Sequence, residues 1–187
     1  MIHPTLARAA DSVLVIVDFQ ERLAAAMDLS ARQAAATNAA ILLQSANCLD
    51  VPVLTTEQYP KGLGPTDADL LTLLPSNAPR IEKTCFSCAG DDSFRQALER
   101  TGRPQVVLAG MEAHVCVLQS ALELRAAGRD VFVVADACCS RNSANHANAM
   151  DRMRTAGVVV TNTESTVFEW LRDARHDRFK ALSALLR

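Results

Sequence analysis

Residues 12–18 read SVLVIVD, an unbroken apolar run that ends in one acidic residue, Asp18. A short apolar run rich in β-branched residues is typical of a strand that is buried on both faces of a sheet. Similar runs follow along the chain and predict five further strands, at residues 51–56, 80–83, 104–110, 130–136 and 158–161.

Helical patterns fill the stretches between these runs. They predict helices at residues 30–48, 67–74, 91–100, 114–127 and 143–156, and two more at 164–172 and 177–186. Because strands and helices alternate without a linker or repeat, we expect one α/β domain over residues 1–187. Its sheet is expected to be doubly wound, mostly parallel and six-stranded, in the order 3-2-1-4-5-6 with helices on both faces. In that order the first and fourth strands meet at the topological switch point, where ligands bind.

The composition is that of an ordinary globular domain. Hydrophobic residues make up 49% of the chain, which excludes a wholly disordered protein. The net charge is −2, so the chain has no large cationic field for a nucleic-acid backbone. No apolar stretch approaches the roughly 20 residues of a membrane helix, and the N-terminal residues do not read as a secretory signal. We therefore expect a cytoplasmic protein with neither nucleic acid nor membrane as a partner.

Three residues that could carry chemistry fall near the carboxyl ends of neighbouring strands. Asp18 ends the first strand, Lys83 ends the third, and Cys116 follows the fourth in the first turn of a predicted helix. A helix amino end lowers the pKa of a thiol and offers free N–H groups to an oxyanion. Each residue also has a purely structural interpretation: Asp18 caps a turn, Lys83 is a solvated strand end and Cys116 is a buried thiol that packs in the core. Their convergence at one sheet edge favours an active site.

Five sequence segments occur in the order of one known family. They are VIVDFQ at 15–20, TEQYPKGLGPT at 56–66, EKTCFS at 82–87, GMEAHVCVLQSA at 110–121 and VFVVADACCSRN at 131–142. Together they resemble the isochorismatase-like cysteine hydrolase superfamily, and most closely its isochorismatase-domain proteins. The similarity spans the chain from the first strand to the last. The set of motifs in order is specific, although each motif alone is weak.

The resemblance implies an Asp-Lys-Cys triad, which falls on Asp18, Lys83 and Cys116. It also implies a cis peptide bond at Met111–Glu112, with the backbone N–H groups of Glu112 and Cys116 as an oxyanion hole. In the implied mechanism Asp18 takes the proton of Cys116, and the thiolate attacks a small amide, ester or related substrate. Water then hydrolyses the thioester. Lys83 keeps the carboxylate ionised, and no cofactor takes part.

Residues that flank the triad motifs are candidates for the substrate pocket. They are Phe19, Gln20, Tyr59, Phe86, Glu112 and His114. Nicotinamidases of this superfamily hold a metal with an Asp and two His after the second strand, but residues 57–67 contain no His. We therefore expect no metal and no nicotinamidase activity. True isochorismatases cleave a vinyl ether without a cysteine nucleophile, so Cys116 favours thioester chemistry on a substrate that the sequence does not name.

A second class of function stays open, a catalytically silent protein that uses thiols for binding or redox chemistry on the same fold. Among the six cysteines, Cys85 and Cys88 form a C-x-x-C motif that alone could suggest redox or zinc chemistry. A zinc site lacks its second pair of ligands in this sequence, and the adjacent Cys138 and Cys139 are expected to pack. The complete triad favours the enzyme.

The last two predicted helices carry apolar stripes. Val167, Trp170 and Leu171 form one stripe, and Phe179, Leu182, Leu185 and Leu186 form the other. Because these helices follow the last strand, one side of each would be exposed unless another subunit covers it. We expect a homo-oligomer, at least a symmetric dimer, and the alternative is that both stripes pack onto their own domain.

Overall fold

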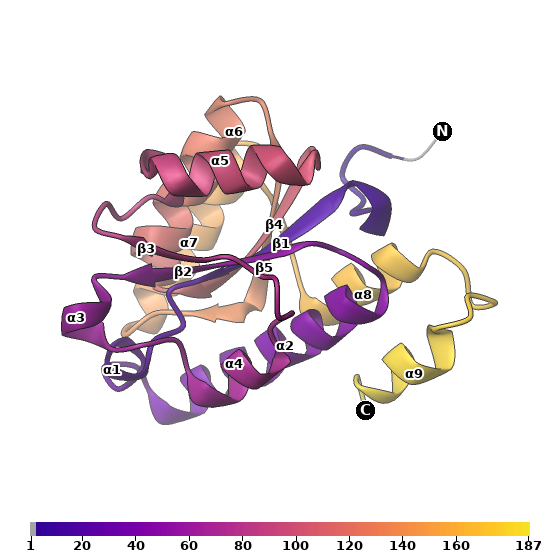
Figure 1. Ribbon diagram of the computed structural model, residues 1–187, viewed down its shortest axis with the longest axis horizontal. Coiled ribbons are helices and arrows are strands. Elements are labelled where there is room, and N and C mark those ends of the chain that lie inside the picture. The colour runs from indigo at the N-terminus through magenta and orange to yellow at the C-terminus, as the bar shows by residue number, and fades with distance from the viewer. Residues whose placement is uncertain (1–2) are drawn as a thin grey trace.

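The computed structural model describes residues 3–187 and confirms the predicted sheet. In these residues six parallel strands pair in the order β3-β2-β1-β4-β5-β6 (Figure 1). The strands are β1 (Ser12–Val17), β2 (Val53–Gln58), β3 (Arg80–Lys83), β4 (Gln105–Met111), β5 (Asp130–Cys139) and β6 (Val159–Thr161). The pairing of β1 with β4 makes the carboxyl ends of these two strands the switch point of the fold.

Helices cover both faces of the sheet. In the described part of the chain they are α1 (Glu21–Ala24), α2 (Leu29–Cys48), α3 (Pro60–Leu63), α4 (Ala68–Leu73), α5 (Asp92–Thr101), α6 (Leu118–Ala126), α7 (Ser143–Thr155), α8 (Thr163–Leu171) and α9 (Phe179–Ala184). Figure 1 shows α5, α6 and α7 on one face and α2, α4 and α8 on the other. None of these helices is both long and apolar enough to cross a membrane.

Strand β1 is buried along its whole length, as its unbroken apolar run predicts. Val13, Val15 and Val17 pack into the core beneath α5, α6 and α7. Leu14 and Ile16 point the other way and pack against α2. Because successive side chains of a strand alternate between its faces, a central parallel strand needs apolar residues at every position.

The segment after β2 is rich in glycine and proline, which is typical of an exposed loop, but the structure shows it ordered. The strand continues to Gln58, the short helix α3 follows, and the segment is tied back by buried polar groups. Glu57 accepts hydrogen bonds from the backbone N and the Oγ1 of Thr66 at 2.8 and 2.7 Å. Gln20 Nε2 donates to the carbonyl of Gly64 at 2.6 Å. Glycines and prolines alone indicate a loop, but these side-chain bonds decide that it is ordered against the start of α1.

Strand β5 is three residues longer than predicted because it contains an irregularity. Its register against β4 shifts between Leu108 and Gly110, after which Gly110 pairs with Cys138 and Met111 pairs with Cys139. Both cysteines are buried, and they pack into opposite cores of the sheet. The two adjacent thiols therefore point away from one another and serve packing.

The C-terminal helices overturn the reason given above for an oligomer. The large apolar residues of α8 and α9 pack onto their own domain, against α2 and against each other. Trp170 is 3% exposed, and its Nε1 donates to Ser12 Oγ at 3.0 Å. Phe168 of α8 is the large apolar residue of these two helices that stays exposed, at 39%. The sequence argument fails because α9 folds back so that Leu182 packs with Val167 and Leu171 of α8.

Candidate active site

The carboxyl edge of the sheet brings together the three residues singled out from the sequence. Asp18 comes directly after β1 and turns with a positive φ of 50°. Lys83 is the last residue of β3, and Cys116 lies in the turn between β4 and α6. Residues far apart in the sequence thus meet because parallel strands end at the same edge.

A buried ion pair forms the centre of this cluster. Lys83 Nζ lies 2.7 Å from Asp18 Oδ2, and neither side chain is exposed to solvent. The ammonium also donates to Gln58 Oε1 at 2.7 Å and to the carbonyls of Phe86 and Cys85 at 3.0 and 3.3 Å. Burial lowers the pKa of Lys83, but the charge and hydrogen bond of Asp18, together with the neighbouring thiols of Cys88 and Cys116, raise it overall. The lysine is therefore charged at neutral pH and surrounded by acceptors.

The second oxygen of Asp18 is also held. Thr56 Oγ1 donates to Asp18 Oδ1 at 2.7 Å, and the backbone N of Asp18 donates to the carbonyl of Thr56 at 3.1 Å. Asp18 also lies close enough to Cys116 for its charge to raise the pKa of that thiol. A carboxylate fixed in this way keeps lone pairs for one further donor.

The surroundings of Cys116 correct one expectation from the sequence. Cys116 lies in a single π-helical turn, Ala113–Val117, which precedes α6, and it is 4% exposed. Burial and the charge of Asp18 raise the pKa of its thiol far above the usual value, and the charge of Lys83 offsets only part of this. The expected lowering by a helix amino end is therefore wrong, because desolvation and a nearby carboxylate both disfavour a thiolate. At rest Cys116 is therefore a neutral thiol beside a carboxylate.

Gly110 allows β4 to approach β1 at the site. A Cβ at this position would lie 2.0 Å from the carbonyl oxygen of Val17, and the φ of Gly110 is +149°. Glycine is the residue that meets both demands. Directly after it, the Met111–Glu112 peptide bond is cis. The close approach sets Glu112 near the turn that carries Cys116.

An ion pair at the rim holds the side chain of Glu112. The backbone N of Arg141 donates to Glu112 Oε2 at 2.9 Å, and the guanidinium adds bonds of 2.5 to 3.1 Å to both oxygens. Burial raises the pKa of Glu112, but the hydrogen bonds and charge of Arg141 lower it overall. Beside this pair, His114 Nδ1 lies 3.0 Å from Ser140 Oγ.

The predicted pocket residues separate into two groups. Phe19 and Gln20 are 1% and 0% exposed; Phe19 packs on the α2 side, and the amide of Gln20 bonds to backbone groups. Tyr59 and Phe86 are 55% and 54% exposed, and both are tied through their backbones to Lys83. His114 is half-buried. The second group, Tyr59, Phe86 and His114, has surface to offer a ligand.

The sequence did not assign to the site four polar or thiol side chains that lie around these three residues, although it gave one of them, Cys88, as part of the C-x-x-C motif. They are Thr56, Gln58, Cys88 and Ser120. Ser120 Oγ donates to the carbonyl of Cys116 at 2.6 Å and accepts from the backbone N of Cys88 at 2.8 Å. The alternation of Thr56 and Gln58 on one face of β2 is the signal that could have identified two of the four.

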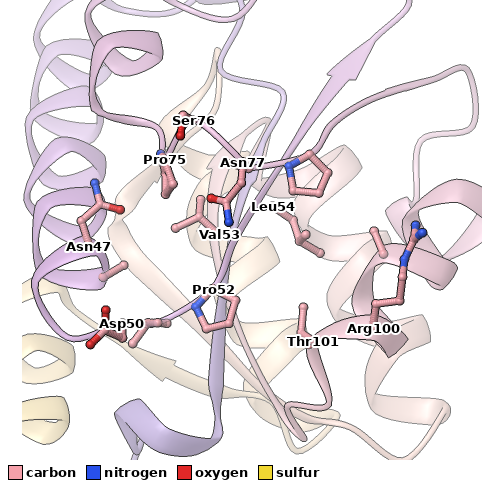
Figure 2. Close-up of a pocket in the computed structure, with 15 residues that line it drawn as sticks. Asn47, Asp50, Pro52, Val53, Leu54, Pro75, Ser76, Asn77, Arg100 and Thr101 are labelled. Atoms are coloured by element: carbon pink, nitrogen blue, oxygen red, sulfur yellow. The ribbon is translucent and has the colours of Figure 1, made fainter.

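The largest of the cavities described lies at the other end of the sheet. It measures about 800 Å³ and lies where β2 begins, between Asn47 and Asp50 on one side and Arg100 and Thr101 on the other (Figure 2). A smaller cavity of about 330 Å³ is lined by Lys83 together with Tyr59, Thr84 and Asp91. Of the three candidate residues, Lys83 borders this smaller cavity, and Asp18 and Cys116 line none of the cavities described.

The cysteines of the C-x-x-C motif differ in environment. Cys88 is buried, and desolvation raises its pKa to about 11, whereas Cys85 is half-buried. All six cysteines are free thiols. In residues 3–187 no three side chains of His, Cys, Asp or Glu gather in a way that could hold a metal ion.

Comparison with known proteins decides the family. The family model described as Isochorismatase domain matches residues 12–165, a range that includes Asp18, Lys83 and Cys116. This chain belongs to the isochorismatase family. It is 38% identical over 178 residues to isochorismatase domain-containing protein 2 of Danio rerio, which covers 94% of this chain and 86% of that protein.

Two solved structures share the fold of this family member and its sequence in part. The MAR1 ribonuclease of Caenorhabditis elegans is 34% identical, with a TM-score of 0.90, over 97% of this chain and 92% of that one. The YcaC gene product of Escherichia coli, described as an octameric hydrolase of unknown specificity, is 28% identical with a TM-score of 0.89, over 97% and 89% of the two chains. At the level of the family, these comparisons support a hydrolase.

Proposed function

We propose that this chain is a cysteine hydrolase that cleaves a small amide, ester or related substrate through a thioester. Its catalytic residues are Asp18, Lys83 and Cys116. One observation carries the proposal: an Asp18–Lys83 ion pair, 2.7 Å long and fully buried, lies against the thiol of Cys116. Burying two charges is costly, and a thiol that only packs has no need of them.

In the first half-reaction Asp18 accepts the proton of Cys116 while Sγ attacks the carbonyl carbon. The C–S bond forms and the carbonyl electron pair moves onto oxygen. We assign the oxyanion to the backbone N–H groups of Glu112 and Cys116, the arrangement that best stabilises such a charge. The bond to the leaving amine or alcohol then breaks, and Asp18 returns its proton to that group. A thioester remains on Cys116.

In the second half-reaction Asp18 takes a proton from water, which attacks the thioester. The C–S bond breaks, the carboxylic acid product leaves, and the proton returns to the thiol. Lys83 compensates the charge of Asp18 throughout. Because its donors are engaged by Asp18 and by carbonyl oxygens, Lys83 acts through its charge rather than by contact with substrate. These steps require neither a metal nor a cofactor.

The exposed residues at the site favour a small substrate. The cavity that adjoins Lys83 measures about 330 Å³, within the range of small-molecule sites. Tyr59 lines this cavity, whereas Phe86, whose carbonyl accepts a hydrogen bond from Lys83, and His114, two residues before Cys116, lie outside its lining. We assign these three residues to substrate binding.

Two other functions are weighed against this one. A redox thiol is normally exposed and of low pKa, but Cys88 is buried and its pKa is about 11, which disfavours a silent thiol protein. The relative from Caenorhabditis elegans is described as a ribonuclease. The net charge of −2 supplies no field for RNA, so we rank RNA below a small molecule.

We also propose that the protein is a cytoplasmic homo-oligomer, at least a symmetric dimer. The support is the octamer described for the Escherichia coli relative. Free thiols throughout the chain suit a reducing compartment.

The test is a panel of small amides, esters and an RNA, offered to the wild type and to Cys116→Ala. We expect turnover of a small amide or ester, and an acyl adduct on Cys116 by mass spectrometry when the reaction is quenched. Cys116→Ala is expected to lower kcat by about 10³-fold or more, because it removes the nucleophile. The matched control is Cys48→Ala, since Cys48 is the last residue of α2 and is half-buried against the C-terminal helices. Turnover that survives in Cys116→Ala contradicts the proposal, and a wild type that cleaves only RNA replaces it.

A further inference from the structure

The ion pair at the site reaches across a strand. Asp18 follows β1 and Lys83 ends β3, but β2 lies between these two strands. Neighbouring strands lie about 4.8 Å apart, so the two backbones are separated by nearly 10 Å. The side chains of β2 therefore lie directly beside the path of the ion pair.

Two side chains of β2 bond to the two members of the pair. Thr56 Oγ1 donates to Asp18 Oδ1 at 2.7 Å. Gln58 Oε1 accepts from Lys83 Nζ at 2.7 Å. The two residues are two positions apart and share one face of the strand. The strand in the middle thus contacts both charges.

Gln58 is itself fixed by buried partners. Its Nε2 donates to the carbonyl of Thr84 at 2.7 Å. Its backbone N donates to Gln20 Oε1 at 2.7 Å, and its carbonyl accepts from Gln20 Nε2 at 3.1 Å. Gln20, which the sequence suggested for the substrate pocket, therefore fixes Gln58, and Gln58 in turn hydrogen-bonds to Lys83. This chain of bonds leaves Gln58 one orientation, with its oxygen toward the ammonium.

We propose that Thr56 and Gln58 are positioning residues, which hold the Asp18–Lys83 pair so that the carboxylate and the ammonium keep fixed positions relative to the Cys116 thiol. The catalytic meaning of this inference rests on the proposed function, whereas its geometric part does not depend on any substrate. Thr56 offsets part of the carboxylate charge by donating a hydrogen bond. Gln58 keeps the ammonium beside Asp18 instead of letting it withdraw toward the carbonyls of Cys85 and Phe86.

The charges have opposite effects on the thiol, which makes the proposal measurable. The carboxylate of Asp18 raises the pKa of Cys116, and the ammonium of Lys83 lowers it. When either hydrogen bond from β2 is lost, the effect of the carboxylate on the pKa of Cys116 grows relative to that of the ammonium. The thiolate fraction at a given pH then falls, and a thiol-specific alkylating agent reacts more slowly.

The experiment compares two variants with two matched controls. Thr56→Val and Gln58→Met each remove one bond to the ion pair and keep the side-chain volume close to the original. The control Thr55→Val removes a buried hydroxyl bond of the same strand, from Thr55 Oγ1 to the carbonyl of Ile16 at 3.1 Å on the opposite face. The control Gln105→Met removes a buried amide at the far end of β4.

The readout is the rate at which iodoacetamide modifies Cys116 at pH 8, followed by mass spectrometry of the peptide. We expect Thr56→Val and Gln58→Met to slow it by up to about tenfold, the effect of one unit in the thiol pKa. Both controls are expected to stay within about twofold of the wild type, because they leave the charges beside the thiol unchanged. With a substrate from the panel, kcat is expected to fall in the two variants while KM changes little.

Equal alkylation rates in variants and controls overturn the proposal. Should Gln58→Met not fold, Gln58→Glu keeps the shape, places a second carboxylate beside Lys83, and is expected to slow alkylation as well. The result is separable from the proposed function. Turnover that survives in Cys116→Ala removes the hydrolase mechanism, whereas unchanged alkylation in Thr56→Val and Gln58→Met removes only the positioning role.

Discussion

At Cys116 two opposite charges act on one buried thiol. Burial and the carboxylate of Asp18 raise its pKa, and Lys83 opposes them. The thiol is therefore protonated at neutral pH, and the thiolate fraction rises with pH across the neutral and alkaline range. A nucleophile of this kind depends on a base at the moment of attack rather than on a stored negative charge.

Removing the charge of Asp18 and removing the charge of Lys83 are expected to change the rate of Cys116 alkylation in opposite directions. Asp18→Asn removes the carboxylate that raises the thiol pKa, so iodoacetamide is expected to modify Cys116 faster at pH 9. The same variant is expected to lose turnover by about 10²-fold or more, because the proton acceptor is gone. Lys83→Met removes the opposing cation and is expected to slow alkylation. Rates measured by mass spectrometry that move in the same direction in both variants would contradict this account.

The sequence singles out Asp18 and Lys83 because a charged residue at the end of a predicted strand is conspicuous. It does not identify Thr56 and Gln58. In a strand such as β2, Thr reads as a β-branched strand former, and its hydroxyl becomes meaningful only when the neighbour is known. The direction of the Cys116 pKa is missed for a similar reason, since helix position can be read from sequence but burial beside a carboxylate cannot.

At the scale of elements, the contact between β1 and β4 sets the geometry of the site. Asp18 leaves β1 where Gly110 of β4 passes closest, and Val17 pairs with Gly110 in the sheet. The approach is possible because Gly110 has no side chain to meet the Val17 carbonyl. The strand pairing and the spacing between the base and the Cys116 turn are therefore coupled.

Gly110→Ala is expected to destabilise the protein strongly and to open this spacing. The added Cβ would lie 2.0 Å from backbone that cannot move without breaking the β1–β4 pairing, so we expect a loss of about 3 kcal/mol or more in the free energy of unfolding. The matched control is Gly128→Ala, which has a positive φ of +85° but no neighbour within 4 Å. It is expected to cost about 1 kcal/mol, the strain of a left-handed residue alone. Urea denaturation of both variants is the measurement. Equal losses in the free energy of unfolding would show that the close approach of position 110 to the Val17 carbonyl does not add to the cost of the substitution.

The element pattern explains what the sequence predicts well and what it does not. The strands β1, β4 and β5 follow from their apolar runs, because a central parallel strand is buried on both faces. The short β3 contains one apolar residue, Ile81, so no apolar run marks it. The predicted end of β2 is wrong because polar residues continue that strand, and the predicted end of β5 is wrong because the strand resumes after Asp136. Glu57 and Gln58 continue β2, held by buried hydrogen bonds, and an irregularity carries β5 past Asp136. Such extensions depend on tertiary contacts rather than on local pattern.

At the scale of the whole molecule, the single chain leaves a few large apolar side chains in solvent. Leu29, Tyr59, Phe86 and Phe168 are between 39% and 56% exposed. Tyr59 and Phe86 belong to the segments that surround Lys83, whereas the C-terminal stripes are covered within the chain. The exposed apolar surface thus lies partly beside the site, and its position differs from the one that the sequence suggested.

The homo-oligomer is tested by light scattering at micromolar concentration. We expect a mass of at least twice the 20.2 kDa of one chain, because relatives of this fold include an octamer. Phe86→Ser and Phe168→Ser form a matched pair, since each replaces an exposed phenylalanine by a small polar residue, one beside the site and one on α8. If the interface lies at the site, Phe86→Ser is expected to lower the mass and the activity together, while Phe168→Ser leaves both unchanged. A wild-type mass near 20.2 kDa would contradict the oligomer, and it would mean that Tyr59 and Phe86 meet the substrate from within a single chain.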